Sequence, residues 1–201
     1  AAVPASEATT RLTRPTQLTS KAKMSSSTET STPNFNFPER QPSGDEKALI
    51  DDVLKLYQLN PITSAYARYS PKATFHDPIG LAEGLEAVKA QFNSMPKVFA
   101  SSVTKDLKVL DNPAVTPPSV QFSLSQLYTL KGTNTEKLVK SLITLHVDSS
   151  DNLIVKHDEE WDGKPNTTGG DGFFGKINEL RKKFTAEAIK VGADTRPVDQ
   201  Q

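Results

Sequence analysis

Apolar side chains recur every three to four residues in three stretches of residues 43–95, which predicts three helices. The sequence SGDE, which has the spacing of a capping box, begins the first stretch. Asn60 and Pro61 predict the start of a second helix, because asparagine caps helices and proline suits their first position, and Pro71 predicts its end. The third helix is expected over residues 84–95, where a proline follows.

From Val98 onward the pattern changes to an alternation of apolar and polar residues, which is typical of strands. The sequences KGTN at 131–134 and DSSDN at 148–152 predict tight turns between antiparallel strands. The fold class is therefore expected to be α+β, a curved antiparallel sheet wrapped around three helices as a cone. The strands are expected near residues 73–77, 98–110, 119–131, 136–148 and 153–162.

Composition divides the chain into three parts. Residues 1–44 are rich in Pro, Ser and Thr and nearly lack large aliphatic side chains, so we expect a disordered tail. Residues 45–163 hold the periodic elements and are expected to form one α+β domain. Residues 164–201 are expected to be a linker, an amphipathic helix over 173–191 and a C-terminal tail.

The beginning of the chain bears on where the protein is found. Residues 1–23 contain Arg and Lys with a single Glu, a composition weakly similar to a mitochondrial transit segment. Met24 followed by SSSTET favours a natural start there, with residues 1–23 as leader or added sequence. With no other address signal, the cytoplasm is the expected location, and the mitochondrion is the alternative if residues 1–23 are native.

Charge and composition exclude several classes of site. The 201 residues carry 24 basic and 24 acidic side chains, which argues against nucleic acid as a partner. The absence of cysteine removes disulfides, thiol nucleophiles and cysteine-ligated metals. No apolar run approaches the roughly 20 residues of a transmembrane segment. The three histidines form no metal-binding motif and no phosphate-binding loop occurs, so no metal and no cofactor are expected.

The order helix, helix, strand, helix and four strands carries a family resemblance. With FHDPIG after the second helix and HDEEWDG ending the last strand, it resembles the SnoaL-like branch of the nuclear-transport-factor-2-like, cystatin-like cone superfamily over about residues 45–163. The resemblance implies a cone with a pocket open at one end and a homodimer formed through the outer face of the sheet. The superfamily includes isomerases, cyclases, dehydratases, epoxide hydrolases and non-enzymatic binding modules, so the resemblance in fold does not decide the function.

Asp77 is the first candidate catalytic residue. If Phe75 packs against the helices, alternation points Asp77 inward at the pocket mouth, where burial would raise its pKa and suit it as a general base. The alternative is that Asp77 caps the turn that begins at Pro78.

The sequence HDEEW supplies the other candidates. Alternation places His157, Glu159 and Trp161 on one face with Leu153 and Val155, which we expect to face the helices. A histidine beside a carboxylate can serve in acid–base chemistry, or it can be a buried polar residue of the core.

Aromatic side chains are the candidate ligand contacts. The indole of Trp161 offers a flat apolar surface to a ring, and tyrosine hydroxyls can hold an oxyanion, although each can equally be a core residue. The residues expected to bind the ligand are Tyr66, Tyr69, Phe75, Phe92, Tyr128 and Trp161.

Three functions follow from these residues. The first is binding of a small, largely apolar molecule without assured catalysis. The second is an acid–base isomerase, cyclase or dehydratase acting on a polyketide-, steroid- or terpenoid-like substrate, with Asp77 or Glu159 as base and His157 as its partner. The third is a protein-interaction module that uses the outer face of the sheet.

Overall fold

The structure is a computed structural model that describes residues 1–2, 36–161, 175, 178–179 and 196–200. The chain divides into two units, Ala1–Thr30 and Ser31–Gln201. In the first unit only residues 1–2 are described, and the second contains every element below. Most of the expected tail and most of the helix expected over 173–191 lie outside the described residues.

The first helix forms as its capping signal predicts. α1 covers Gly44–Tyr57, and both halves of the capping box are present. The Glu46 N–H donates to Ser43 Oγ at 3.2 Å, and the Ser43 N–H donates to Glu46 Oε2 at 2.7 Å. These two bonds satisfy donors that a helix start otherwise leaves free.

The segment after α1 is more extended than its sequence predicts. α2 covers only Thr63–Tyr66, and β2 begins at Tyr69 and runs to Asp77. The helix expected up to Pro71 is therefore wrong in its second half. The β2 pairing shifts register between Tyr69 and Thr74, so Pro71 lies in the irregular part of the strand, where its missing N–H costs no regular ladder bond.

Two further boundaries differ around α3. A short strand, β3, covers Gly80–Glu83 and pairs with β2, although its four residues gave no clear alternation. α3 covers Leu85–Val98 and passes through Pro96, which was expected to stop it. A proline so near the helix end removes a single backbone hydrogen bond of the last turn, and the helix finishes two residues later.

Four longer strands confirm the alternating pattern, namely β4 (Phe99–Leu110), β5 (Val120–Leu130), β6 (Glu136–Val147) and β7 (Ile154–Trp161). A two-residue strand, β1 (Glu39–Arg40), was not predicted. The strand order is β1-β4-β5-β6-β7-β2-β3. β1 lies within the stretch that composition assigns to the tail. β2 pairs with β7 in parallel, so the sheet is mixed, whereas the sequence predicted antiparallel strands.

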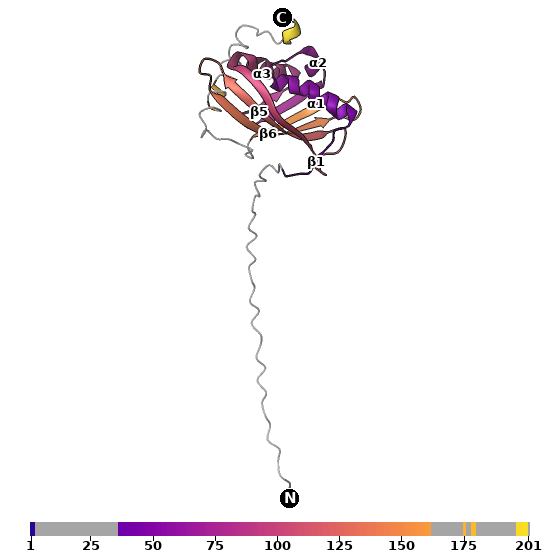
Figure 1. The fold of residues 1–201 in the computed structure, drawn as a ribbon. Coiled ribbons are helices and arrows are strands. Elements are labelled where there is room, and N and C mark those ends of the chain that lie inside the picture. Colours follow the sequence, from indigo (N-terminus) through magenta and orange to yellow (C-terminus); the bar gives the residue numbers. More distant parts are fainter. Residues whose placement is uncertain (3–35, 162–174, 176–177, 180–195, 201) are drawn as a thin grey trace. The chain divides into compact units, whose positions relative to one another are not determined.

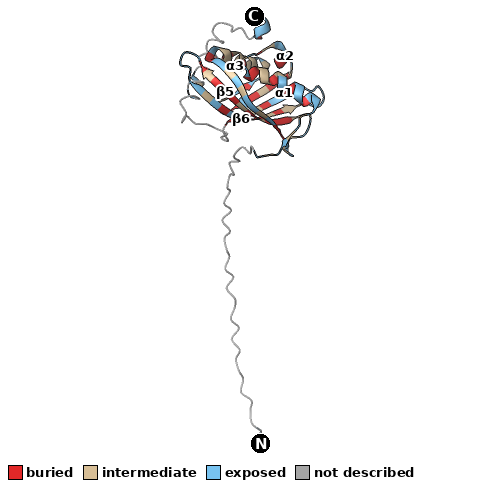
Figure 2. Ribbon diagram, in the orientation of Figure 1, coloured by how far each residue is buried: buried red, intermediate tan, exposed pale blue. Residues whose placement is uncertain are grey.

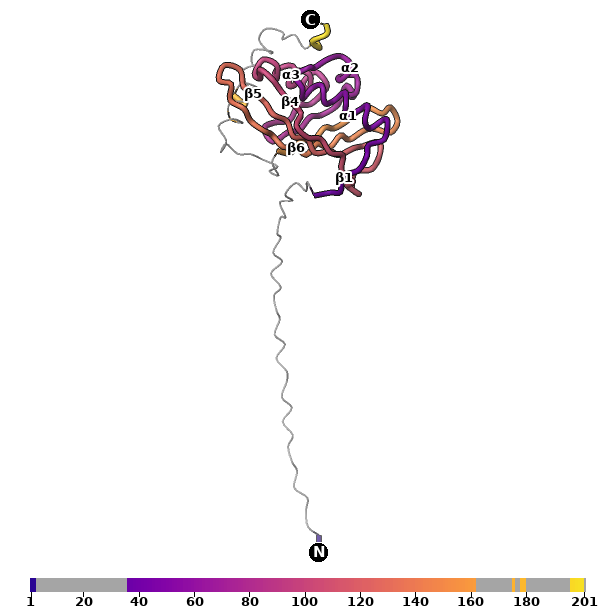
Figure 3. Tube along the Cα trace, in the orientation of Figure 1, coloured from indigo at the N-terminus to yellow at the C-terminus, as the bar shows by residue number. Residues whose placement is uncertain are grey.

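The helices lie on one face of the curved, open sheet, and the core lies between them, so the fold is the expected α+β cone (Figure 1). Figure 2 shows buried positions along the strands beneath the helices, and the tube in Figure 3 follows the long strands β4, β5 and β6 across the sheet. The buried apolar residues form two clusters, a larger one that includes Val53, Phe75 and Phe92 and a smaller one that includes Tyr128 and Trp161.

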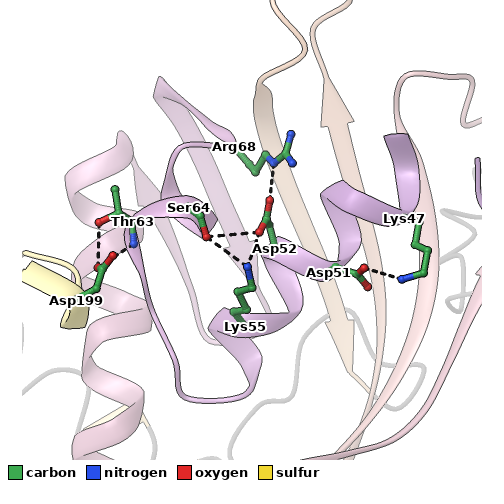
Figure 4. A network of polar contacts seen from close by, with 8 residues as sticks. All are labelled: Lys47, Asp51, Asp52, Lys55, Thr63, Ser64, Arg68 and Asp199. Atoms are coloured by element: carbon green, nitrogen blue, oxygen red, sulfur yellow. Dashed lines mark hydrogen bonds and ion pairs between the residues drawn. The ribbon is translucent and has the colours of Figure 1, made fainter. Parts of the chain in front are cut away.

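Polar contacts join α1, α2 and the residues next to them on the exposed side of the helices (Figure 4). Asp52 accepts from Lys55 Nζ at 2.7 Å and from Arg68 Nε at 2.8 Å, which joins α1 to the chain after α2. Asp199, in the short 3-10 helix η1 (Val198–Gln200), accepts from the Thr63 N–H at 3.0 Å and from its hydroxyl at 2.9 Å. No helix among the described residues is long and apolar enough to cross a membrane.

Candidate functional site

A cavity of about 60 Å³ lies between the two apolar clusters of the core. Its wall is mostly aromatic and aliphatic, and two carboxyl groups, those of Asp77 and Glu159, are part of it. Three of the rings belong to the larger cluster and three to the smaller one, so the cavity is the seam where the clusters meet. These rings belong to Tyr57, Phe75, Phe92, Phe99, Tyr128 and Trp161.

Asp77 ends β2, and its side chain both caps the following turn and reaches the cavity. Its Oδ1 accepts from the Ile79 N–H at 3.0 Å, which is the turn-capping bond. Its Oδ2 accepts from Gln91 Nε2 on α3 at 3.0 Å. The side chain is buried and lines the cavity, so the turn cap and the position in the pocket coexist.

Glu159, near the end of β7, is the second buried carboxyl group of the cavity. Ser141 Oγ and Trp161 Nε1 donate to its Oε1 at 2.6 and 2.7 Å, and Tyr57 Oη donates to its Oε2 at 2.8 Å. Burial, with a smaller effect from the charge of Asp77, raises the pKa of Glu159 to about 7, although the three donors lower it. Glu159 therefore exchanges its proton near neutral pH.

His157 lies behind the cavity wall and is fully buried. Its Nε2 is 3.0 Å from Tyr57 Oη, and its Nδ1 is 2.9 Å from Tyr69 Oη. The ring of Phe75 meets it edge-on at 4.7 Å between centroids. Burial, followed by the charge of His146, lowers the pKa of His157 to about 3, so the imidazole is neutral at physiological pH.

The tyrosines of the interior keep their protons. Burial is the largest cause that raises the pKa of Tyr57, Tyr69 and Tyr128 well above the usual value, and the charge of Glu159 adds to it. Their hydroxyls therefore act as hydrogen-bond donors and acceptors and not as acids. Tyr66 is different, because its hydroxyl donates to Asn93 Oδ1 at 2.7 Å and the residue does not line the cavity.

The structure thus brings most of the expected site residues together. Tyr66, Tyr69 and His157 are buried but are not part of the cavity wall. Those that line the wall are Phe75, Asp77, Phe92, Tyr128, Glu159 and Trp161.

One expectation about β7 is wrong. Leu153 and Val155 were assigned to the inner face, but Ile154 is fully buried and Val155 is 39% exposed. The pairing with β6 shifts register between Lys156 and Ile154, so a bulge at Val155 changes the facing residues ahead of His157.

Tyr57 is the main contributor that sequence reasoning missed. It ends α1 on its apolar stripe, so its pattern indicates only a core residue. It is 100 residues from His157, and only the packing of α1 onto the sheet brings their polar atoms together. Ser141 and Gln91, which bond the two carboxyl groups, gave no sequence signal either.

A second hollow, of about 560 Å³, lies at the start of α1 beside Pro117 and Pro118. It is larger, but its wall is more polar, and two of its three charged residues, Glu46 and Arg68, already pair with Arg40 and Asp52. The smaller cavity is the candidate site because it encloses buried carboxyl groups among aromatic rings. Among the residues that the structure describes, no three acidic or histidine side chains gather to hold a metal ion.

No family model matches the sequence, and no curated protein matches it. Among solved structures, a steroid delta-isomerase from Pseudomonas aeruginosa has a TM-score of 0.52 at 13% identity, over 74% of this chain and 97% of that chain. The chain has the SnoaL-like, nuclear-transport-factor-2-like fold.

Two more structures with this fold are similar to the chain. A nuclear-transport-factor-2-like protein from Anabaena variabilis has a TM-score of 0.48 at 18% identity, over 63% of this chain and 98% of that chain. A nuclear-transport-factor-2-like protein of unknown function from Burkholderia pseudomallei has a TM-score of 0.49 at 10% identity, over 60% of this chain and 93% of that chain. At these identities the likeness extends to the fold alone, and the function has to be argued from the site.

Proposed function

We propose that the protein binds a compact, largely apolar molecule in the cavity between the two core clusters. The observation that carries this proposal is a wall of buried aromatic rings interrupted by two carboxyl groups. Rings supply apolar contact area, and a few polar groups fix the orientation of the ligand. The volume of about 60 Å³ is well below the roughly 300–1,000 Å³ of pockets for drug-sized molecules, which favours a ligand of about one ring.

A second candidate is acid–base catalysis on such a ligand, favoured by the pKa of about 7 at Glu159. A group that titrates near the working pH can both take and return a proton. Glu159 is the base in this proposal, Asp77 is the second carboxyl group beside the ligand, and Tyr57 holds Glu159. The reaction would be an isomerisation, cyclisation or dehydration in which about one ring of a polyketide-, steroid- or terpenoid-like substrate occupies the cavity. The Pseudomonas aeruginosa protein that shares the fold is named a steroid delta-isomerase.

We also propose a homodimer through the outer face of the sheet. Val103, Leu127 and Leu138 are direct cross-strand neighbours on β4, β5 and β6. They lie on the opposite face from the buried Gln126 and Tyr128, and Val103 and Leu138 are 47% and 41% exposed. A row of apolar side chains on an open sheet face favours a self-complementary contact.

Native mass spectrometry of the purified full-length protein tests the binding proposal. We expect a retained small molecule that is released on denaturation, and the same spectrum gives the oligomeric state. A Val139→Phe variant fills the cavity and should lose the molecule. A Val155→Phe variant makes the same change on the outside of β7 and should keep it. If both variants retain the molecule equally, the cavity is not the binding site.

A further inference from the structure

Four polar side chains form an unbroken chain of hydrogen bonds that ends at the cavity. Tyr69 Oη is 2.9 Å from His157 Nδ1, His157 Nε2 is 3.0 Å from Tyr57 Oη, and Tyr57 Oη is 2.8 Å from Glu159 Oε2. All four residues are buried, and they come from α1, β2 and β7. Their hydrogen-bonding options are limited because so little of their surface reaches water.

We infer that His157 is a positioning residue. It is held as the neutral tautomer with its proton on Nε2, it accepts from Tyr69 and donates to Tyr57, and it thereby turns the Tyr57 proton toward Glu159. The inference deepens the acid–base candidate, and its consequence for catalysis rests on that proposed function. The tautomer itself is a property of the protein with or without a reaction.

Proton counting carries the inference. The three links need one proton each, and the two tyrosines and the neutral imidazole supply one each. An ionised Glu159 can only accept, so Tyr57 must donate to it. The Tyr57 oxygen then faces His157 as an acceptor, which requires a proton on Nε2. Nδ1 is left as an acceptor, and Tyr69 donates to it.

The opposite tautomer fails the same count. With the proton on Nδ1, His157 Nε2 would accept from Tyr57, and no proton would remain between Tyr57 Oη and an ionised Glu159. Two acceptor oxygens would then face each other at 2.8 Å in a buried site. That arrangement is possible only when Glu159 carries a proton on Oε2. A proton on His157 Nδ1 therefore reports a protonated Glu159.

Burial has the largest effect on the pKa of Glu159, and the hydrogen-bond chain acts against it through Tyr57. Titratable groups of several elements face Glu159 and His157. The charge of His146 on β6 also acts on His157. From α3 the ring of Phe92 packs beside the imidazole and does not titrate. The groups that face Glu159 or His157 are Tyr57 of α1, Tyr69 and Asp77 of β2 and Tyr128 of β5.

The consequence is a site whose resting state accepts protons. Every donor in the chain of hydrogen bonds is directed toward Glu159. Ser141 and Trp161 donate to its other oxygen, Oε1. This arrangement stabilises the carboxylate against its burial. His157 does not touch the cavity, so its effect on a substrate would pass through Tyr57 and Glu159.

Long-range proton–nitrogen NMR on the nitrogen-15-labelled full-length protein tests the tautomer. A His157→Gln variant identifies the His157 signals among those of the three histidines. Above pH 8 we expect a protonated Nε2 and an unprotonated Nδ1. A proton on Nδ1 at that pH, or on both nitrogens, overturns the inference. This measurement needs no ligand, whereas loss of ligand retention in the mass spectrum counts against the proposed function alone.

The pKa of Glu159, followed by carbon-13 NMR, separates positioning from packing. His157→Leu removes the donor and should raise the proton affinity of Glu159 by about threefold to tenfold. His157→Gln can present an N–H near the position of Nε2 and should stay within about twofold of the unmodified protein. Equal effects of the two variants, or none from His157→Leu, overturn the inference. If His157→Leu does not fold, the tautomer in the unmodified protein decides.

Discussion

Replacing Tyr57 with Phe removes one hydroxyl and tests the reasoning about Glu159. The ring still packs against Phe92, whose centroid lies 5.6 Å away, so little apolar contact is lost. Glu159 loses the 2.8 Å bond to its Oε2 and keeps the donors Ser141 and Trp161. The change also removes the 3.0 Å bond between Tyr57 Oη and His157 Nε2, but His157 is neutral at both pH 5 and pH 8. The part of the effect that depends on pH therefore comes from one carboxyl group.

The size of the effect follows from the pH. A hydrogen bond to a charged group contributes about 1.5–3 kcal/mol, and one between neutral groups about 0.5–1.5 kcal/mol. At pH 5 Glu159 is protonated in the folded protein, because its pKa is about 7, and Tyr57→Phe should cost the smaller amount. At pH 8 Glu159 is ionised, and the cost should be larger by about 1–2 kcal/mol. The pKa of Glu159 should rise correspondingly by about one unit.

The sign follows from proton linkage. The pKa of Glu159 rises on folding from 4.5 to about 7, so the folded state binds more protons between these values. The contribution of Glu159 to stability is therefore fully present below pH 4.5 and is lost as the pH rises through 7. Tyr57→Phe should extend this loss to higher pH, because it raises the folded-state pKa further.

Urea unfolding of the unmodified protein and of Tyr57→Phe at pH 5 and pH 8 measures the difference. Tyr66→Phe is the matched control, because it removes a hydroxyl bonded to Asn93, away from the cavity. Its cost should be the same at both pH values. An equal cost of Tyr57→Phe at pH 5 and pH 8 would refute the assignment of Tyr57 as a donor to an ionised Glu159.

Three further changes test separate parts of the structure. Glu159→Gln removes the buried charge, so the free energy of unfolding should vary less between pH 5 and pH 8 than in the unmodified protein, as measured by urea unfolding. Asp199→Ala removes the side chain that caps α2 and should cost about 0.5–2 kcal/mol with faster hydrogen exchange there, whereas Asp51→Ala at an exposed ion pair should cost under about 0.5 kcal/mol. Leu138→Lys should shift a dimer toward monomer in light scattering, and Leu81→Lys, an exposed site outside the apolar row, should not.

Local signals predicted the parts of the fold that depend on neighbours in sequence. The capping box at Ser43 and Glu46 forms as its spacing indicates, and the alternation in β5 matches the buried face of the sheet. The second helix was predicted too long because Pro71 reads equally as a helix end or as an irregular position in a strand. The choice depends on β7, which lies about 80 residues later and pairs with β2.

The site was predictable where alternation alone decides which way a side chain faces. Glu159 and Trp161 reach the cavity as expected, since they follow the bulge and share one face of β7. The bulge at Val155 could not be predicted, because it arises from the match between β6 and β7 and not from the residues of β7 alone. Tyr57 was missed for a similar reason, since its hydroxyl acquires a role only where α1 crosses the sheet.

The chemistry of Glu159 depends on a balance that only the folded protein provides. Burial and the charge of Asp77 favour the protonated form, and the three donors favour the carboxylate. A ligand in the cavity changes both sides of this balance, because it displaces water from beside the carboxyl group. An apolar ligand should therefore raise the pKa of Glu159, whereas a ligand that donates a hydrogen bond to it should lower the pKa. The direction of that shift on binding therefore shows whether the bound molecule presents a hydrogen-bond donor to Glu159.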